Sequence, residues 1–521
     1  MMWLTMVAAL CLAVAGQTPL DLKALGRPTE EELRRNQMDM LVIVGSVTSS
    51  SARVVYEPLV ADKMSDLTVT LWLDGEHVVE EKSHHQYRAY PYALAYSDLT
   101  PNSTYVVTIA LGETIRGSAQ FRTTPLDIAV ERLTLVSLSC DRFLQDVDDS
   151  HWKTLAQDIQ DDPSYFGTIH MGDQIYADDL VTNFQRAPFE SALRAFRGLY
   201  RRGFGRPAVQ QILRRGAHYM MIDDHDIINN WSRDVFATYN TFARAGLQAF
   251  YEYQYQLLGD ITDLPKAFDS TSRGELYRPV YHAVSLGKNQ LELVFADTRF
   301  ERGLTLKSNE LMSKTQLSFV EAALAKNASH FVVFSPLPLF FHTETSGALA
   351  ETFDKEFYPG HFLFRQRVDQ LWTLLSSKSI PSVHLIAGDL HMAHQASVCD
   401  PGHSKCIPQL VSSGMTIGST SMNERKILFF HYLVSQWLQK GACLWAVVTR
   451  ASTGVCVYTE YTYYGQNYLK ITWDHGKLST AFVTKPFDEK VDQVLEWILQ
   501  WVLDFRFCAA LGAILALRAW M

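Results

Sequence analysis

The sequence lacks an excess of basic residues. Its 521 residues include 47 Lys and Arg against 56 Asp and Glu, and the net charge is -9. Proteins that bind a phosphate backbone normally carry a surplus of Lys and Arg, so we expect no nucleic acid as a structural partner. The acidic residues can serve another purpose, because carboxylates hold metal ions.

Low-complexity segments and internal repeats are also absent from the sequence. With 47% hydrophobic and 20% charged residues, the composition is that of an ordinary globular protein, so no long disordered segment is expected. The length corresponds to about three domains of roughly 150 residues, although one large α/β layer could take much of it. The chain can therefore bury a sizeable core.

The apolar run at the N-terminus contains neither Lys nor Arg. It covers residues 1–15 and ends in the small-residue pattern Ala13-Val14-Ala15, before the polar Gln17. Such a run is typical of a secretory signal peptide, which we place at residues 1–16, with a buried N-terminal helix as the alternative. A signal peptide would direct the protein into the secretory pathway, to be secreted or held at the cell surface.

A second apolar stretch, residues 497–517, lies near the C-terminus and is long enough to span a bilayer. Asp504 and Arg506 interrupt it, at a cost of roughly 2.5 to 3.5 kcal/mol each inside a membrane. Three interpretations of the segment 491–521 stay open: a membrane tether, a terminal helix packed on the protein, and the removable tail of a lipid-anchor signal.

Cysteine is sparse, with 7 residues in the chain. Two lie in the terminal segments, and the others are Cys140, Cys399, Cys406, Cys443 and Cys456. In an oxidising compartment Cys399 could pair with Cys406 across a Pro-Gly loop, and Cys443 could pair with Cys456. Cys140 is then the free thiol.

Short alternating runs rich in Val, Thr and Tyr fill residues 38–125. Examples are LTVTLWL at 67–73 and TYVVTIAL at 104–111, which are separated by Asp-Gly and Pro-Asn turns. This pattern predicts a small all-β sandwich. The segment 99–105, together with FRTTP at 121–125, resembles the fibronectin type III class.

The rhythm changes over residues 131–484, where short apolar runs alternate with long helical stretches, as in a layered α/β domain. The predicted strands are 133–138, 166–170, 219–222, 291–296, 331–335 and 383–388. The predicted helices are 187–214, 236–258, 315–326 and 363–377, with an amphipathic helix at 426–440 and closing strands within 442–483.

Metal-compatible residues follow five of these strands, at the point where each strand ends. The five segments are Ser139-Cys140-Asp141, Gly172-Asp173-Gln174-Ile175-Tyr176, Asp223-Asp224-His225-Asp226, Asp297-Thr298-Arg299 and Gly388-Asp389-Leu390-His391. Ligands gather outside the carboxyl ends of strands in open α/β sheets, so we expect one crevice there. Four titratable groups in a row after an apolar strand would repel one another unless cations neutralised them. A solvated acidic turn is the alternative for that run.

These motifs resemble the PhoD-like alkaline phosphatase family, within the wider calcineurin-like metallophosphoesterases. SCDRF, MGDQIYAD, DDHDIINNW, ADTR and AGDLHMAH occur in the family's order, and the resemblance covers about Met38 to Asp474. It implies an α/β fold: a layered calcineurin-like metallophosphoesterase domain at 131–484, preceded by the small fibronectin III-like sandwich. It also implies bound ferric iron and calcium, with other divalent metals as the alternative.

The family's ligands carry over to matching positions. Cys140, Asp173 and Tyr176 correspond to ligands of the ferric ion, and Asp173 and Asp224, with Asp389 and His391, would hold the calcium zone. Asp173 is the natural bridge between two metals. Read without the resemblance, Cys140 would be a buried structural thiol and Tyr176 a core aromatic residue.

Four further residues are expected to act on the substrate. Asn229 or Asn230 would orient phosphate, Arg299 would clamp phosphate oxygens, and His225 would assist the leaving group as a general acid. Arg299 could instead be a structural ion-pair partner. The remaining acidic residues Asp141, Asp178 and Asp179 are expected outside the ligand set.

The sequence thus predicts a metal-dependent phosphoesterase that hydrolyses phosphate monoesters or diesters with metal-activated water and without a covalent phosphoenzyme. The substrate would be a phosphorylated small molecule, nucleotide or lipid. The alternatives are an inactive surface protein of the same fold, for binding or as a scaffold, and a phosphodiesterase directed at lipid head groups.

Overall fold

The computed structural model describes residues 40–485, except 60–65, 85–89, 145, 147, 233–239, 262–278, 304–309, 344–345, 349, 352–356, 402–403, 417–435, 442 and 444–454. The predicted signal peptide at 1–16 and the apolar segment 491–521 lie outside the described residues. Within them, no helix combines the length and the apolar character needed to cross a membrane.

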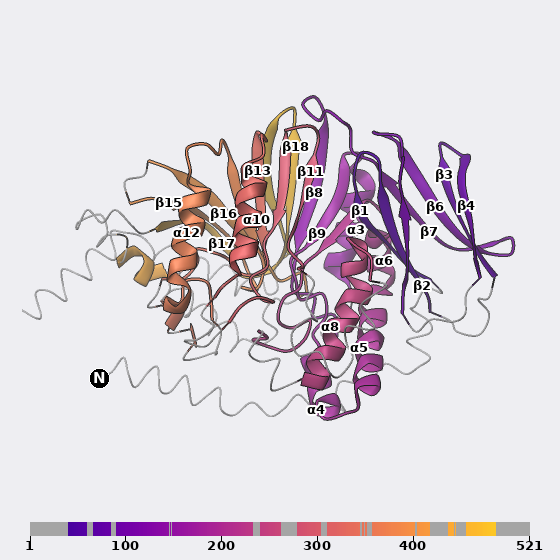
Figure 1. Cartoon of the computed structure of the whole chain (residues 1–521), viewed down its shortest axis with the longest axis horizontal. Coiled ribbons are helices and arrows are strands. Elements are labelled where there is room, and N and C mark those ends of the chain that lie inside the picture. The colour runs from indigo at the N-terminus through magenta and orange to yellow at the C-terminus, as the bar shows by residue number, and fades with distance from the viewer. Residues whose placement is uncertain are drawn as a thin grey trace, which may run out of the picture.

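The N-terminal part consists of β-strands in two small antiparallel sheets (Figure 1). The strands are β1 (Met40–Val47), β2 (Ala52–Pro58), β3 (Asp66–Leu73), β4 (Glu76–His84), β5 (Tyr92–Tyr96), β6 (Thr104–Leu111) and β7 (Thr114–Arg122). The sheet orders are β1-β2-β5 and β4-β3-β6-β7. Buried residues occupy every second position in most of β6, which is the alternation expected when one face of a sheet packs on a core.

The second part contains two larger mixed sheets. The first has the order β10-β9-β8-β18-β19 and the second β11-β12-β13-β14-β16-β15-β17. The strands of the first are β8 (Arg132–Leu138), β9 (Tyr165–His170), β10 (Ala217–Met220), β18 (Gln466–Asp474) and β19 (Lys477–Lys485). Those of the second are β11 (His282–Leu286), β12 (Leu291–Phe295), β13 (His330–Ser335), β14 (Val383–Ala387), β15 (Ala393–Cys399), β16 (Cys406–Ser412) and β17 (Cys456–Tyr463).

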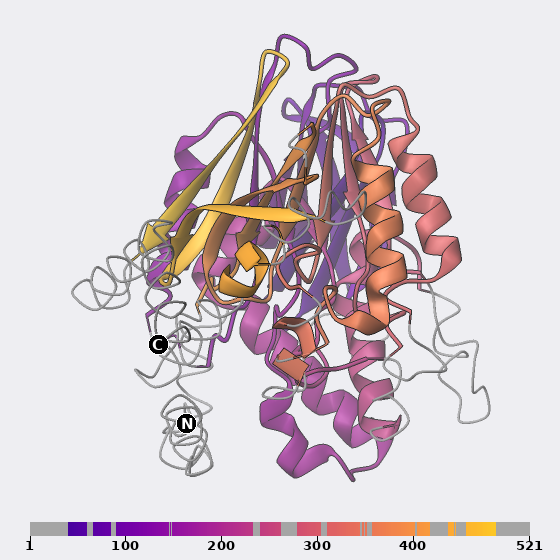
Figure 2. The ribbon, with the colours of Figure 1, turned by 90° about the vertical axis from the view of Figure 1, so that its left-hand side faces the viewer.

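Helices cover the outer sides of the two sheets (Figure 2). They are α3 (Ser150–Asp161), α4 (Asp178–Phe184), α5 (Phe189–Phe204), α6 (Pro207–Leu213), α8 (Asn240–Tyr253), α10 (Lys314–Leu324) and α12 (Arg365–Leu375), with the short 3₁₀ helices η2 (Tyr255–Leu257) and η3 (Phe362–Phe364). Val136 packs with helices α3, α5, α6 and α8, whereas Val333 packs with α10 and α12. Leu135 and Leu293 belong to the core between the sheets, so the layers run α/β/β/α.

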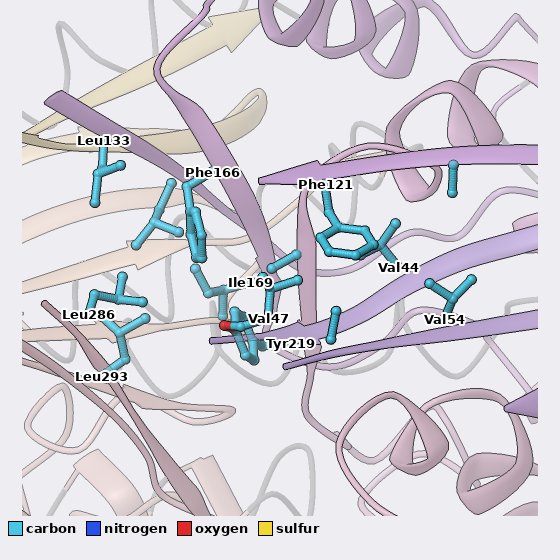
Figure 3. Packing of buried hydrophobic residues seen from close by; sticks show 14 of the residues in the cluster. Val44, Val47, Val54, Phe121, Leu133, Phe166, Ile169, Tyr219, Leu286 and Leu293 are labelled. Atoms are coloured by element: carbon cyan, nitrogen blue, oxygen red, sulfur yellow. The ribbon is translucent and has the colours of Figure 1, made fainter. Parts of the chain in front are cut away.

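The small sheets pack directly on the larger ones. Val44 and Phe121 share one hydrophobic core with Phe166, Ile169 and Tyr219 (Figure 3). The backbone N–H of residue 120 in β7 donates to the carbonyl oxygen of residue 214 over 2.8 Å, which adds a polar link next to β10. The β-rich part and the α/β part therefore share a continuous interior.

The predicted fold class is confirmed, and every predicted strand of the α/β part has a counterpart within two residues. The single helix predicted at 187–214 is wrong, because the chain forms α5 and α6 with a break at Gly205-Arg206. Pro207 causes the break: the residue before a proline is pushed out of the helical region, and Arg206 is extended with ψ 135°. The helix predicted at 426–440 lies largely outside the described residues.

Both expected disulfides are present, Cys399–Cys406 and Cys443–Cys456, and Cys140 is a buried free thiol. The cysteine pairing inferred from the sequence is therefore confirmed.

Candidate metal centre

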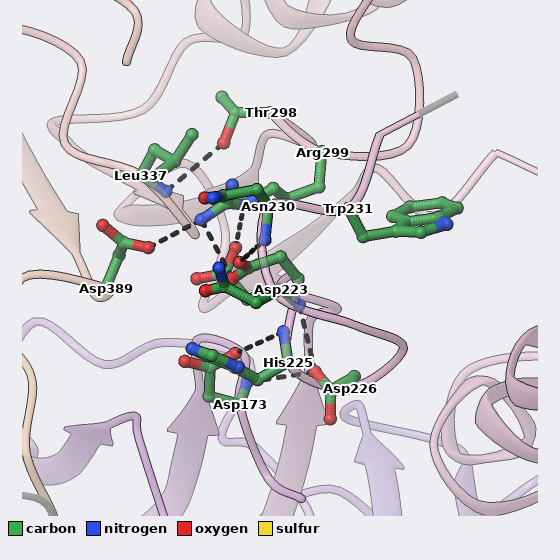
Figure 4. A network of polar contacts seen from close by, with 12 residues as sticks. Asp173, Asp223, His225, Asp226, Asn230, Trp231, Thr298, Arg299, Leu337 and Asp389 are labelled. Carbon is green, nitrogen blue, oxygen red and sulfur yellow. Dashed lines mark hydrogen bonds and ion pairs between the residues drawn. The ribbon is translucent and has the colours of Figure 1, made fainter. Parts of the chain in front are cut away.

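The predicted site residues follow strands of both large sheets. β8 leads to Cys140, β9 to Asp173 and β10 to Asp224 in the first sheet, whereas β12 leads to Arg299 and β14 to Asp389 in the second. Arg299 forms ion pairs with Asp224 and Asp389, so the strand ends of the two sheets meet (Figure 4). The centre therefore lies where the strand ends of the two sheets meet.

One end of the centre combines a thiol, a carboxyl group, a phenol and an imidazole. The Sγ atom of Cys140 lies 3.4 Å from Oδ2 of Asp173, and the hydroxyl of Tyr176 donates to the same oxygen over 3.1 Å. The Tyr176 oxygen is also 3.2 Å from Nε2 of His391. Ligand atoms of Cys140, Asp173 and His391 lie within 4.8 Å of one another. His391, expected beside Asp389 in the calcium zone, therefore belongs geometrically to the thiol end.

Two further groups of ligand-type atoms extend the centre from Asp173. Asp173, Asp224 and His225 form one group within 4.8 Å, and Asp223, Asp224 and Asp389 form another. Asp173 is shared by the first two groups, and Asp224 by the last two. The three groups therefore form one continuous cluster, in which Asp173 occupies the position expected for a bridging carboxylate.

Arg299 lies inside this cluster. Its side chain is 0% exposed, and its Nη2 atom lies 3.1 Å from Oδ1 of Asp224 and 2.6 Å from Oδ1 of Asp389. Its Nε atom donates to Oδ1 of Asp223. Asp297, two residues earlier, accepts the Arg299 backbone N–H over 2.8 Å and so fixes the turn that carries it. Arg299 thus holds together three carboxylates from both sheets.

Asp178 orients His225. The Nδ1 atom of His225 lies 2.5 Å from Oδ2 of Asp178, and the backbone N–H of Asn229 donates to the other oxygen of this carboxylate over 2.6 Å. The His225 ring also stacks on Tyr176 with 4.3 Å between ring centroids. With Nδ1 bound to Asp178, the imidazole can present Nε2 to the cluster. The backbone N–H of Asn230 donates to Asp224, while the Asn229 side chain is exposed.

Burial and neighbouring charges disfavour the ionised forms of the thiol and of the carboxyl groups in the cluster. Burial, followed by the charge of neighbouring Asp389 and Asp223, raises the pKa of Cys140 to about 12, although hydroxyl groups of Ser139 and Ser413 act against this. Burial and the Cys140 thiol raise the pKa of Asp173 well above its usual range. Bound metal ions reverse this balance, because they stabilise thiolate and carboxylate.

The pKa values of the two histidines at the centre are shifted in opposite directions. Burial alone would lower the pKa of His225, but the carboxylates of Asp178, Asp224 and Asp173 outweigh it and raise the pKa well above the ordinary value. For His391 burial prevails, assisted by the positive charges of His225 and Arg142, and lowers the pKa to about 3. The lowered pKa leaves His391 neutral and suited to bind a metal, whereas the carboxylates around His225 favour its protonated form.

The donor set fits the metals that the resemblance implies. Thiolate, phenolate and imidazole suit a transition metal such as iron, whereas several carboxylate oxygens suit calcium. The Oδ2 atom of Asp223 is buried and has no hydrogen-bond partner among the described residues, as expected of an oxygen facing a cation.

Backbone conformation also sets the centre apart. Positive φ angles occur at five predicted site residues, namely Cys140 (62°), Asp173 (57°), Asn230 (60°), Asp389 (70°) and His391 (52°). Left-handed conformations are costly for side chains with a Cβ atom and gather where function needs a particular geometry.

Several supporting residues were not predicted. Asp223 is not among the metal ligands predicted from the sequence, although it stands in the acidic run after β10. The Oδ2 atom of Asp226 accepts the backbone N–H groups of Asp173 and Asp223, both over 3.0 Å. Ser413 lies 3.0 Å from the Cys140 sulfur and accepts the backbone N–H of His391 over 2.9 Å. Ser413 directly follows β16, but pairs of serines are common in loops, so the sequence gave little indication that it contacts the centre.

Comparison with known proteins identifies the family. The model of the family described as PhoD-like phosphatase matches residues 135–457. The chain belongs to this family. The recognition made from the five motifs is therefore confirmed, and it supports a metal-dependent phosphoesterase. A search of curated proteins found no match.

Solved structures of this fold agree with the family. The structure of PhoD is 14% identical, with a TM-score of 0.61, and the match covers 85% of this chain and 88% of that one. A purple acid phosphatase from yellow lupin (Lupinus luteus) seeds is 10% identical, with a TM-score of 0.51, and the match covers 88% and 76% of the two chains. At these identities the likeness concerns the fold, which PhoD-like phosphatases share with the lupin enzyme.

Proposed function

We propose that this PhoD-like phosphatase hydrolyses phosphate monoesters or diesters with metal-activated water. The observation that carries the proposal is the continuous cluster of ligand-type side chains around Asp173, which serves two of the ligand groups. A two-metal phosphoesterase requires such a shared carboxylate with ligands on each side of it.

Cys140, Asp173 and Tyr176, joined by His391, would hold a ferric ion. Asp173 and Asp224, with Asp389 and the unpredicted Asp223, would hold calcium. When bound, the ions supply Lewis-acid charge at the phosphoryl oxygens and lower the pKa of water. The protein's contribution is to fix these donors through left-handed backbone positions and the Asp226 hydrogen bonds.

His225 would act as the general acid. Asp178 binds its Nδ1 atom and keeps the ring protonated, so the Nε2 proton can pass to the leaving-group oxygen. Asn229 or Asn230 would orient the phosphoryl group through a side-chain amide. Arg299 supports the carboxylates around it, and its expected contact with a phosphate oxygen would add to that role.

The protein would work in the secretory pathway, on a phosphorylated small molecule, nucleotide or lipid. Its two disulfides support folding in an oxidising compartment. The proposed signal peptide and the proposed C-terminal tether concern segments outside the described residues.

Reconstitution tests the function. Protein stripped with a chelator should lose hydrolysis of an aryl phosphate and regain it with iron and calcium. Asp173→Asn should lose at least about a hundredfold in kcat, because both ligand groups lose their shared charge. Asp369→Asn, on the exposed side of α12, serves as the matched control and should keep full activity. Full activity after chelation, or an active Asp173→Asn protein, would overturn the proposal.

A further inference from the structure

Arg142 follows the proposed thiolate ligand by two positions and reaches the solvent-facing side of the centre. Its guanidinium carbon lies 5.5 Å from the centroid of the Tyr176 ring, and its side chain is 27% exposed. The hydroxyl of Tyr176 contacts both Asp173 and His391, so this ring connects Arg142 with the ligand cluster. A permanent positive charge therefore lies next to the cluster at a point that solvent reaches.

Two consecutive carboxylates at the start of α4 hold two cations beside Tyr176. Asp178 binds Nδ1 of His225 over 2.5 Å, and Asp179 pairs with Nη2 of Arg142 over 3.7 Å. Both cations contact the Tyr176 ring, His225 by stacking and Arg142 through its guanidinium. The proposed general acid and Arg142 are thus positioned by the same turn of chain.

Asp141, the residue before Arg142, is held through both its backbone N–H and its carboxylate. The N–H of Asp141 donates to the carbonyl oxygen of Asp173 over 2.9 Å, and its carboxylate accepts from Nε1 of Trp152 over 3.1 Å. Arg206 forms an ion pair with the same carboxylate. Because Asp141 is tied to Trp152 and Arg206, Arg142 extends from a rigid base toward Tyr176.

Arg142 and Arg299 differ in what surrounds them. Arg299 is 0% exposed and engaged by three carboxylates, so a substrate oxygen must compete with Asp223, Asp224 and Asp389 for it. Arg142 forms an ion pair with Asp179 over 3.7 Å, and both side chains are partly exposed to solvent. A guanidinium has a planar fork of N–H donors that matches two phosphate oxygens, and an arriving anion can approach Arg142 from the solvent.

We propose that Arg142 binds the phosphoryl group and selects monoester dianions over diesters. A monoester carries one more unesterified oxygen and one more negative charge than a diester, and Arg142 supplies a donor and a charge for them. Asp179 is a positioning residue, because it acts through Arg142. This inference rests on the proposed function, since it concerns substrate choice at the same centre.

The test compares an aryl phosphate monoester with a bis-aryl diester on the full, metal-loaded protein. Arg142→Gln should lower kcat/KM for the monoester about 10- to 100-fold, mainly through KM, as expected when a charge-assisted hydrogen bond is lost. The diester should change less than about threefold, because it lacks the additional unesterified oxygen and negative charge that Arg142 would bind. Inhibition by inorganic phosphate should weaken in parallel with monoester binding, while metal content stays at the wild-type value.

Three matched variants complete the test. Arg194→Gln removes an exposed arginine of α5 and should leave both substrates unaffected. Arg142→Lys keeps the positive charge but lacks the planar N–H donors of the guanidinium group. Its kcat/KM for the monoester should therefore lie between those of Arg142→Gln and the wild type. Asp179→Asn should raise the monoester KM in the same direction as Arg142→Gln, by a smaller factor.

The outcomes separate the two proposals. If the metal-loaded wild type hydrolyses neither ester, the proposed function fails. If the wild type is active but prefers the diester, or if Arg142→Gln changes both substrates by the same factor, the inference about Arg142 is wrong. Should Arg142→Gln fail to fold, an unchanged ratio of the two rates in both Arg142→Lys and Asp179→Asn overturns it.

Discussion

Gly172 makes the close contact between β9 and β10 on which the centre depends, and its replacement by alanine should damage stability and activity together. Its φ angle is 109°, which residues with a side chain rarely adopt. A Cβ atom at this position would lie 2.2 Å from Cβ of Asp223 and 2.9 Å from its backbone nitrogen. The methyl group must therefore displace a residue of the cluster.

The expected magnitude follows from these two effects. Holding alanine in such a backbone conformation costs about 1 to 3 kcal/mol. Overpacking a rigid site costs about 1 to 3 kcal/mol more, because backbone atoms rather than a flexible side chain must move. Together the loss is about 2 to 6 kcal/mol, which lowers the midpoint of thermal unfolding by roughly 2 to 6 °C in a chain of 521 residues.

Gly198 in α5 provides the matched control. A Cβ atom at this position meets no heavy atom within 4 Å. Gly198→Ala should raise stability by about 1 kcal/mol, because alanine favours a helix interior over glycine. Thermal unfolding, bound metal and hydrolysis of an aryl phosphate should be measured for both variants. A Gly172→Ala protein with the wild-type midpoint and rate would refute the reasoning, and so would equal losses in both variants.

Two further predictions concern single side chains. Cys140→Ser should lose iron, the visible thiolate- and phenolate-to-iron colour and most activity while keeping its fold; elemental analysis that finds only zinc in the wild type, or iron retained in the variant, contradicts this. Burial, followed by the charges of neighbouring aspartates, raises the pKa of Asp146 from 3.8 to about 6, so ionising it costs stability as pH rises through that interval. Asp146→Asn should therefore be more stable than the wild type by about 1 kcal/mol at pH 7, after allowance for solvent screening, and by much less at pH 4. Denaturant unfolding at both pH values measures this, and a difference independent of pH would count against it.

The strands of the α/β part were predictable because strands that are buried on both faces appear in the sequence as short apolar runs. LELVF in β12 and HFVVFS in β13 are buried almost throughout, as the helices on one side and the first large sheet on the other require. Once the strands were placed, the residues following them were candidates for the centre, whatever the family. The ligand-type side chains near Asp173 could therefore be predicted from the sequence.

The sequence did not indicate which hydrogen-bond or ion-pair partner each side chain of the acidic run after β10 contacts. Asp223, Asp224 and Asp226 stand in one acidic run, yet the first two are paired with Arg299, whereas Asp226 accepts backbone N–H groups. Spacing alone predicts that they are close, and only the turn after β10 decides which way each side chain points. The same limit explains His391, whose ring lies with Tyr176 at the thiol end.

The segment after β16 shows why part of a site between two sheets escapes sequence reasoning. Ser412 belongs to the second sheet, but its hydroxyl donates to the carbonyl oxygen of Ser137 in β8 over 3.0 Å. The backbone N–H of Met415 donates to the carbonyl oxygen of Ser139 over 2.9 Å, and that of Thr416 donates to the carbonyl oxygen of Cys140. These bonds hold the end of β8 against the end of β16. The position of the Cys140 sulfur therefore depends on residues more than two hundred positions later in the chain, whose serine and glycine composition is that of an ordinary loop.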